Sequence, residues 1–206
     1  MKHEFITQLK QAKVALVGLG VTGLSMLRFL LEHDIQPDVF DANETPPSHA
    51  QNNELLSQVS SQFGPLTTKQ FVGYDFVLIS PGVSIAEPSL QFARSLGIEV
   101  FCDIELFARI NTKPVIAVTG SNGKSTVVAW LTDFLNKVGL NAVACGNYGV
   151  PVLDVVDDAV SVFVLELSSF QLDTTESLVC EAAAVLNVSP DHLDRYESFA
   201  DYAQSK

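Results

Sequence analysis

The chain has 206 residues, of which 47% are hydrophobic, and a formal net charge of −12 at pH 7. A chain of this length and composition can bury the core of one large or two small domains, so general disorder is excluded. The negative charge argues against nucleic acid and against an anionic membrane as partners, because an acidic surface repels polyanions. We therefore expect any phosphate to be bound locally, by backbone amides and single lysines.

The chain contains three cysteines, Cys102, Cys145 and Cys180. An odd number without C-x-x-C spacing indicates buried reduced thiols rather than a disulfide framework or a zinc site. The first 13 residues have no apolar core of signal-peptide length, and no later run is long enough for a membrane helix. These features predict a cytoplasmic protein.

Short apolar runs alternate with helical patterns, which is typical of α/β domains whose parallel sheet is covered on both faces. The first group predicts a Rossmann-like N-terminal domain over residues 1–102. Its expected strands lie at residues 13–17, 39–41, 76–79 and 98–101. A helix after the first strand is expected to place Leu24, Leu27 and Leu31 on one face.

The second group predicts a P-loop-type α/β central domain over residues 103–206. Its strands are expected at residues 115–118, 142–144, 162–165 and 182–186, with a helix over about 125–138. A capping pattern at Ser198 begins a last helix that reaches Lys206 without a C-cap signal, so this domain is expected to be incomplete. Lys206 follows Phe199 by seven residues, on the apolar face. It is either a functional lysine or a frayed terminal residue in water.

The sequence T-G-S-N-G-K-S-T at residues 119–126 follows a predicted strand and precedes a helix, which is the setting of a loop that binds the phosphates of ATP. We expect an anion at the amides of residues 122–125, Lys124 at the terminal phosphates, and Ser125 or Thr126 on Mg²⁺. The common Walker spacing would place a glycine at Val118, which this chain lacks. An ordinary turn is the alternative. The candidate ATP-binding residues are Gly120, Ser121, Asn122, Gly123, Lys124, Ser125 and Thr126.

A second glycine pattern, Gly18-x-Gly20-x-x-Gly23, follows the first predicted strand, and Asp41 ends the next strand. This pattern resembles a dinucleotide fingerprint, with glycines for close phosphate approach and an acid for a ribose or base. It fits NAD, a UDP-linked ligand, or close packing of helix on sheet.

Three polar residues follow strands of the second group, at the edge where parallel sheets bind ligands. Glu166 can hold magnesium or be a partly exposed glutamate. His192 can bind a metal or orient phosphate, or be a loop histidine capped by Asp191 or Asp194. Asn147 can donate to a ligand or occupy a left-handed turn.

Together these segments resemble the Mur ligases over the whole chain. The segment E-L-S-S-F-Q-L at residues 166–172 is most similar to the members that add D-glutamate. In that family a first domain holds the uridine end of the substrate, a second binds ATP, and a third, absent here, helps bind the amino acid. The other matching segments lie at residues 18–23, 80–83, 119–126, 146–149 and 192–196.

The resemblance implies a role for individual residues. Glu166 and His192 become magnesium ligands with Ser125, and Lys206 corresponds to a lysine that is carbamylated and then acts as a carboxylate-like metal ligand. Lys124, His192 and Lys206 are the implied catalytic residues. The implied contacts to the UDP moiety are Gly20, Val21, Thr22, Asp41 and Gly82, and those along the muramoyl-alanine path are Asn147, Ser168 and Gln171.

The implied reaction uses ATP to phosphorylate the L-alanine carboxylate of UDP-N-acetylmuramoyl-L-alanine, after which the amine of D-glutamate displaces phosphate. A nicotinamide-dependent dehydrogenase is a rival reading that uses Gly18 to Gly23 and Asp41 but leaves residues 119–126 unexplained. A nucleotide-binding module without catalysis is another, and a chain of this extent is expected to be inactive alone.

Overall fold

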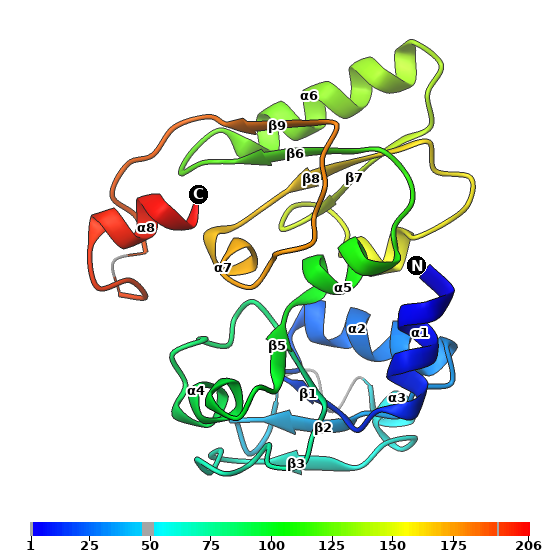
Figure 1. Cartoon of the computed structure of the whole chain (residues 1–206). Coiled ribbons are helices and arrows are strands. Elements are labelled where there is room, and N and C mark those ends of the chain that lie inside the picture. Colours follow the sequence, from blue (N-terminus) through cyan, green and yellow to red (C-terminus); the bar gives the residue numbers. More distant parts are fainter. Residues whose placement is uncertain (1, 47–51, 193) are drawn as a thin grey trace. The chain divides into compact units, whose positions relative to one another are not determined.

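The computed structural model describes residues 2–46, 52–192 and 194–206. The chain divides into two compact units, Met1–Ile110 and Asn111–Lys206, each built on a sheet of parallel strands (Figure 1). This confirms the predicted fold class, whereas the domain boundary expected after residue 102 stays a prediction. Among the described helices, none combines the length and the apolar character that crossing a bilayer requires.

The first unit has a five-stranded sheet in the order β3-β2-β1-β4-β5. All four residues of β1 are buried, as expected for a central parallel strand covered on both faces. The chain passes from β1 to β2 on one side and later to β4 on the other, so the carboxyl end of β1 is a switch point of the sheet. The strands are β1 (Val14–Val17), β2 (Asp38–Asp41), β3 (Ser61–Phe63), β4 (Phe76–Ile79) and β5 (Glu99–Phe101).

The helices of the first unit include the predicted one and several that the sequence did not indicate. In α2 (Val21–Glu32), Leu24 and Leu27 are buried as predicted, while Leu31 is only half-buried. The helices α1 (Lys2–Gln11) and α5 (Asp103–Ile110) pack against each other, and Figure 1 shows them with α2 beside the sheet. The remaining helices are α3 (Asn53–Leu56) and α4 (Pro88–Ser95).

The second unit has a four-stranded sheet in the order β7-β8-β6-β9, with α6 (Lys124–Lys137) packed along it (Figure 1). Its core joins Val128 of α6 to valines of the central strands, Val118 and Val164. Every strand matches its predicted position within two residues. They are β6 (Val115–Thr119), β7 (Ala142–Gly146), β8 (Val162–Glu166) and β9 (Ala182–Val185). The short helices are η1 (Val152–Val155), α7 (Ser169–Leu172) and α8 (Phe199–Ser205).

The cysteines are free thiols, and Cys102 and Cys145 are buried as predicted. Cys180 is only half-buried, so the prediction of burial is wrong for this residue. It precedes β9, the edge strand, whose four residues are all exposed. Partial burial still raises the pKa of the Cys180 thiol, because the thiolate loses hydration.

Candidate functional site

The carboxyl ends of the four strands in the second unit meet at one edge of the sheet, and the predicted residues follow them there. Residues 120–123 follow β6, Asn147 follows β7, and Glu166 ends β8. All four strands are parallel, so their carboxyl ends share one edge, as predicted.

The loop between β6 and α6 has the backbone that a phosphate-binding loop requires. Gly120 and Gly123 both have positive φ, +140° and +86°, a conformation that favours glycine. α6 begins at Lys124, so its first N–H groups have no partner within the helix and its positive dipole end faces the loop. Lys124 Nζ donates to the carbonyl oxygens of Gly120 (2.8 Å) and Ser121 (2.9 Å), which holds the amine over the loop.

Two loop residues are already engaged inside the protein. Ser121 is buried, and its hydroxyl bonds to the carbonyl of Ser189 (2.9 Å) and to the hydroxyl of Tyr202 (2.8 Å). The amide of Asn122 donates to Asn187 Oδ1 (2.9 Å). The amide of Asn122 is thus taken up within the protein in this conformation, and anion binding at residues 122–125 stays a prediction. Thr126 is exposed on the first turn of α6.

Glu166 is the buried carboxylate of this edge, with 2% of its surface exposed, which excludes the partly exposed alternative. Its Oε2 accepts from the hydroxyl of Ser125 (2.7 Å) and its Oε1 from Nδ2 of Asn147 (2.7 Å). Each carboxylate oxygen keeps a further lone pair. Hard oxygen donors of this kind fit Mg²⁺, so Glu166 and Ser125 suit the predicted ion.

A glycine lets β7 end close to the backbone of Glu166. A Cβ added at Gly146, where φ is +99°, would lie 2.5 Å from the carbonyl oxygen of Glu166. The amide of Asn147 donates to that same oxygen at 2.9 Å. Among the described non-glycine residues only Asp34 and His192 have positive φ, so the left-handed alternative for Asn147 is wrong.

Lys206 reaches the same edge from α8. Its Nζ donates to Thr119 Oγ1 (3.1 Å) and to the carbonyl of Gly120 (3.3 Å), so it is not a frayed residue in water. Burial and, after it, the nearby charge of Lys124 lower the pKa of Lys206 to about 8. Three carboxylates oppose this shift in pKa, those of Asp191, Asp173 and Glu166.

α8 is held in place by its cap and by one buried side chain. Ser198 accepts from the amide of Asp201, as the capping pattern predicted. Tyr202 is 1% exposed, whereas Phe199 is 43% exposed, so the predicted apolar face is buried only in part. Tyr202 therefore fixes the helix that carries Lys206 to the loop residue Ser121.

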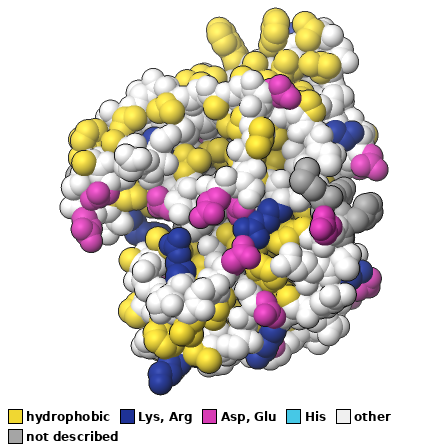
Figure 2. Space-filling model, in the orientation of Figure 1, with side chains coloured by type: hydrophobic (Ala, Val, Ile, Leu, Met, Phe, Trp, Pro, Cys, Tyr) yellow, Lys and Arg dark blue, Asp and Glu magenta, His cyan; other side chains and the backbone are white. Residues whose placement is uncertain are grey.

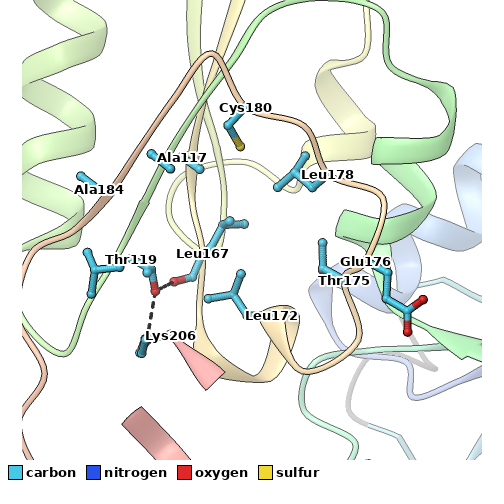
Figure 3. A pocket seen from close by; sticks show the side chains of 12 residues that line it. Ala117, Thr119, Leu167, Leu172, Thr175, Glu176, Leu178, Cys180, Ala184 and Lys206 are labelled. Atoms are coloured by element: carbon cyan, nitrogen blue, oxygen red, sulfur yellow. Dashed lines mark hydrogen bonds between the residues drawn. The ribbon is translucent and has the colours of Figure 1, made fainter. Parts of the chain in front are cut away.

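A cavity of about 220 Å³ lies beside Lys206. In Figure 3, Thr119 stands between Lys206 and Leu167, and its hydroxyl donates to the carbonyl of Leu167 at 2.8 Å. The rest of the lining is mainly small or apolar and includes Ala117, Leu172, Leu178, Cys180 and Ala184.

His192 lies at the rim of this edge with its side chain 48% exposed. Its amide donates to Asp191 Oδ1 (3.0 Å), its Nε2 lies 3.7 Å from Asp191 Oδ2, and its ring centre is 4.9 Å from that of Phe170. His192 thus has the contacts of a loop histidine that is capped by Asp191. In the part of the chain that the structure describes, no three His, Cys, Asp or Glu side chains form a metal cluster. The predicted magnesium site therefore needs Ser125 and Lys206 as ligands in addition to Glu166 and His192.

Ser168 and Gln171 form hydrogen bonds with each other. Ser168 caps α7 by accepting from the amide of Gln171 (3.2 Å), and Gln171 Oε1 accepts from the amide of Ser168 (3.1 Å). Gln171 is 1% exposed, while Ser168 is half-buried. Their present role is to start α7 directly after β8, and their contact with substrate stays a prediction.

In the first unit, the glycine turn after β1 is packed against its neighbours. A Cβ at Gly23 would lie 1.8 Å from the carbonyl oxygen of Gly18, and a Cβ at Gly18 would lie 2.7 Å from Val83. Asp41 is buried, and its Oδ2 accepts from the amide of Leu19 at 2.8 Å. Close packing around this turn therefore explains two glycines of the pattern, Gly18 and Gly23.

The residues predicted to contact UDP surround this turn without forming a closed site. Gly20 and Gly82 are exposed, Val21 is 73% exposed, and Thr22 is half-buried. Asp41 Oδ1 accepts from both the amide (2.9 Å) and the side chain (2.8 Å) of Asn43. The acid expected to bind a ribose or base thus holds its own loop in this conformation.

Sequence reasoning missed three residues of the second site: Thr119, Asn187 and Tyr202. Each bonds to a residue of the loop or to Lys206. The sequence separation between partners is 65 to 87 residues, so no local pattern indicated these contacts. The available signals were the position of Asn187 directly after a predicted strand and that of Thr119 at the start of the loop motif.

Family models match most of the chain in two segments. Residues 12–102 match the Mur ligase MurD-like N-terminal domain, and residues 118–206 match the Mur ligase middle domain. A UDP-N-acetylmuramoylalanine–D-glutamate ligase of Pseudoalteromonas translucida is 46% identical over 98% of the chain, and one of Escherichia coli is 44% identical over 89%. The chain covers 46% and 41% of these two relatives, so it spans about half the length of the curated relatives it matches.

Solved structures agree on the fold. The UDP-N-acetylmuramate:L-alanyl-gamma-D-glutamyl-meso-diaminopimelate ligase of Neisseria meningitides has a TM-score of 0.57 at 19% identity, over 94% of this chain and 66% of its own. The UDP-N-acetylmuramate-alanine ligase of Thermotoga maritima has a TM-score of 0.51 at 19% identity, over 94% of this chain and 46% of its own. Since two Mur ligase models cover both units and the fold agrees, the chain belongs to the Mur ligase family, as a MurD-like N-terminal domain followed by middle-domain sequence.

Proposed function

We propose that the chain supplies the substrate-binding and nucleotide-binding units of an ATP-dependent ligase that adds D-glutamate to UDP-N-acetylmuramoyl-L-alanine in peptidoglycan synthesis. The observation that carries this proposal is the buried Glu166 carboxylate bonded to Ser125 directly beside the phosphate loop. The family and the names of the 44–46% identical relatives support the choice of substrates. A cytoplasmic location fits the free thiols.

In this proposal the loop residues bind the phosphates of ATP. Lys124 exchanges its bonds to the carbonyls of Gly120 and Ser121 for phosphate oxygens, where its charge stabilises phosphoryl transfer to the L-alanine carboxylate. The N–H groups at the start of α6 add their dipole to the same oxygens. The amine of D-glutamate then attacks the acyl phosphate and releases phosphate.

Glu166 and Ser125 would hold Mg²⁺, with His192 and a carbamylated Lys206 as further ligands. A bound magnesium ion supplies charge neutralisation at the phosphates. Asn147 keeps Glu166 oriented through the bond to Oε1. Carbamylation would turn the Lys206 amine into an anionic oxygen donor beside Thr119, and an amine with a pKa of about 8 is neutral often enough to react with CO₂.

The first unit would bind the UDP moiety at the switch point beside β1, through Gly20, Val21, Thr22, Asp41 and Gly82. The strand order supports this placement, because open α/β sheets bind ligands at the switch point of the sheet. Asp41 would keep its bond to the amide of Leu19, which shapes the turn, and exchange the bonds of its other oxygen to Asn43 for a bond to the ligand.

Titration calorimetry on the 206-residue chain tests the proposal with three ligands: MgATP, UDP and NAD. We expect MgATP and UDP to bind and NAD to bind no better than UDP. Replacing Lys124 by alanine should weaken the binding of MgATP at least about tenfold, because a charged contact to phosphate is lost. UDP binding should not change, since its site lies in the other unit.

The matched control is Lys137→Ala, at the other end of α6, where the lysine pairs with Asp133 on the surface. This variant should bind MgATP as the original chain does. A clear preference for NAD would contradict the ligase proposal in favour of a dehydrogenase, and equal MgATP affinity in both lysine variants would remove the role of Lys124.

A further inference from the structure

Asn187 makes three hydrogen bonds to the phosphate loop. Its carbonyl accepts from the amide of Ser121 (3.0 Å), its Oδ1 from the amide of Asn122 (2.9 Å), and its Nδ2 donates to the carbonyl of Asn122 (2.9 Å). The side chain thus acts on the loop as a neighbouring β-strand would, pairing with the N–H and the C=O of one residue. Asn187 follows β9 by two positions, so these bonds tie the loop to the sheet.

The loop is shaped to lie against this residue. A Cβ added at Gly120 would lie 3.1 Å from the carbonyl oxygen of Asn187 and 3.2 Å from the backbone nitrogen of the same residue. Both distances are shorter than most Cβ contacts. The positive φ of Gly120, +140°, independently favours glycine there. Glycine at position 120 therefore serves the approach of the loop to Asn187.

The same segment holds the loop a second time, through Ser189. The Ser121 hydroxyl donates to the carbonyl of Ser189 at 2.9 Å and accepts from its amide at 3.0 Å. Residues 187–189 thereby fix residues 121 and 122 from one side. The N–H groups that remain for an anion are those that follow, at the start of α6.

We propose that Asn187 is a positioning residue for nucleotide binding: it takes up both polar groups of the Asn122 backbone, and so orients the loop with the following amides open to phosphate. The inference rests on the proposed function, because it assumes that the loop binds a nucleoside triphosphate. Pre-organisation of this kind raises affinity, because the ligand does not have to order the loop when it binds.

The chain offers a close control for this arrangement. Asn136, near the end of α6, holds the backbone of Ala142 in the same reciprocal way: its Nδ2 donates to the carbonyl (3.0 Å) and its Oδ1 accepts from the amide (2.8 Å). Asn136→Ala removes the same two types of bond at the opposite end of the helix. Its stability loss should resemble that of Asn187→Ala, because each substitution removes the same two types of bond.

The experiment measures the affinity of MgATP and of inorganic tripolyphosphate by calorimetry, and the unfolding free energy by urea, for the original chain and both variants. We expect Asn187→Ala to weaken the affinity for both ligands at least tenfold. Asn136→Ala should leave both affinities within twofold of those of the original chain. Tripolyphosphate isolates the loop, because it has no nucleoside to contact other residues.

Equal affinities in the two alanine variants would overturn the positioning role, and failure of the original chain to bind MgATP would overturn the proposed function itself and the positioning role with it. Asn187→Asp keeps an acceptor for the Asn122 amide but loses the donor to its carbonyl, and it replaces the alanine variant if that one does not fold. Unchanged affinity in Asn187→Asp would likewise contradict the proposal.

Discussion

At the scale of single residues, the environment of Lys206 makes a chemical prediction. Burial and the charge of Lys124 disfavour its cationic form, so its pKa falls from 10.5 to about 8. The amine is protonated below that pH and becomes neutral as the pH rises through it. At pH 8 roughly half of the Lys206 amines are neutral, against below about 1% for an ordinary lysine of pKa ~10.4.

We therefore expect Lys206 to react with isotope-labelled acetic anhydride faster than surface lysines, with a rate that rises through pH 7–9 and levels off above the pKa. Peptide mass spectrometry measures the extent of modification at each lysine. Lys137, whose side chain is 72% exposed, is the internal reference. Equal rates at Lys206 and Lys137 across this pH range would contradict the shifted pKa.

Which site residues the sequence could indicate depended on where their partners lie. Glu166 and Lys124 were predictable, because each sits at a fixed position after a strand and such positions bind ligands in parallel sheets. The bonds of Ser121 were not, since they join it to residues 68 and 81 positions away. The loop motif alone assigned the Ser121 residue to ATP, whereas its hydroxyl is engaged inside the protein.

At the scale of secondary structure, buried strands were the most predictable elements. β1, β4 and β8 are buried at every position, and each therefore appears in the sequence as a continuous apolar run, which in β8 extends up to Glu166. β3 is polar and largely exposed, so it has no such run. In α5 the charged side chains Asp103 and Glu105 are buried, which interrupts the apolar pattern of its inner face.

The turn between β1 and α2 makes a prediction about element packing. In Gly23→Ala the new methyl group would lie 1.8 Å from the carbonyl oxygen of Gly18, and both atoms belong to backbone-fixed positions. The turn must open, so we expect a loss of about 3 kcal/mol in the unfolding free energy of the first unit. Urea denaturation followed by circular dichroism measures it.

Gly82→Ala is the control, because a Cβ there meets no atom within 4 Å. This substitution should change the unfolding free energy by less than about 0.5 kcal/mol. A small effect of Gly23→Ala, equal to that of the control, would show that the fingerprint glycine is not needed for packing and would leave ligand approach as its reason.

At the scale of the whole molecule, the second unit exposes several large apolar side chains. Trp130, Phe134 and Val138 are 81%, 61% and 59% exposed, and their spacing of four residues places them in one stripe along α6. Figure 2 shows hydrophobic side chains gathered at the edge of the molecule that carries α6. The edge strand β9 is exposed at all four positions and, in the described part of the chain, pairs only with β6.

Apolar stripes and open strand edges both favour association, so we expect the 206-residue chain to self-associate as its concentration rises. Trp130 is the single tryptophan and reports on the α6 stripe. Its fluorescence should be that of a hydrated indole in dilute solution and shift to shorter wavelength with association, in step with the mass measured by sedimentation.

Two lysine substitutions decide which surface is responsible. Phe134→Lys should abolish the fluorescence shift and the association if α6 forms the contact, whereas Val185→Lys should do so if β9 does. Val72→Lys is the matched control in the first unit, because Val72 and Val185 are both 54% exposed. A chain that remains monomeric with unshifted tryptophan emission at about 100 μM would contradict the prediction. The apolar side chains of α6 and β9 would then remain exposed to water without driving association.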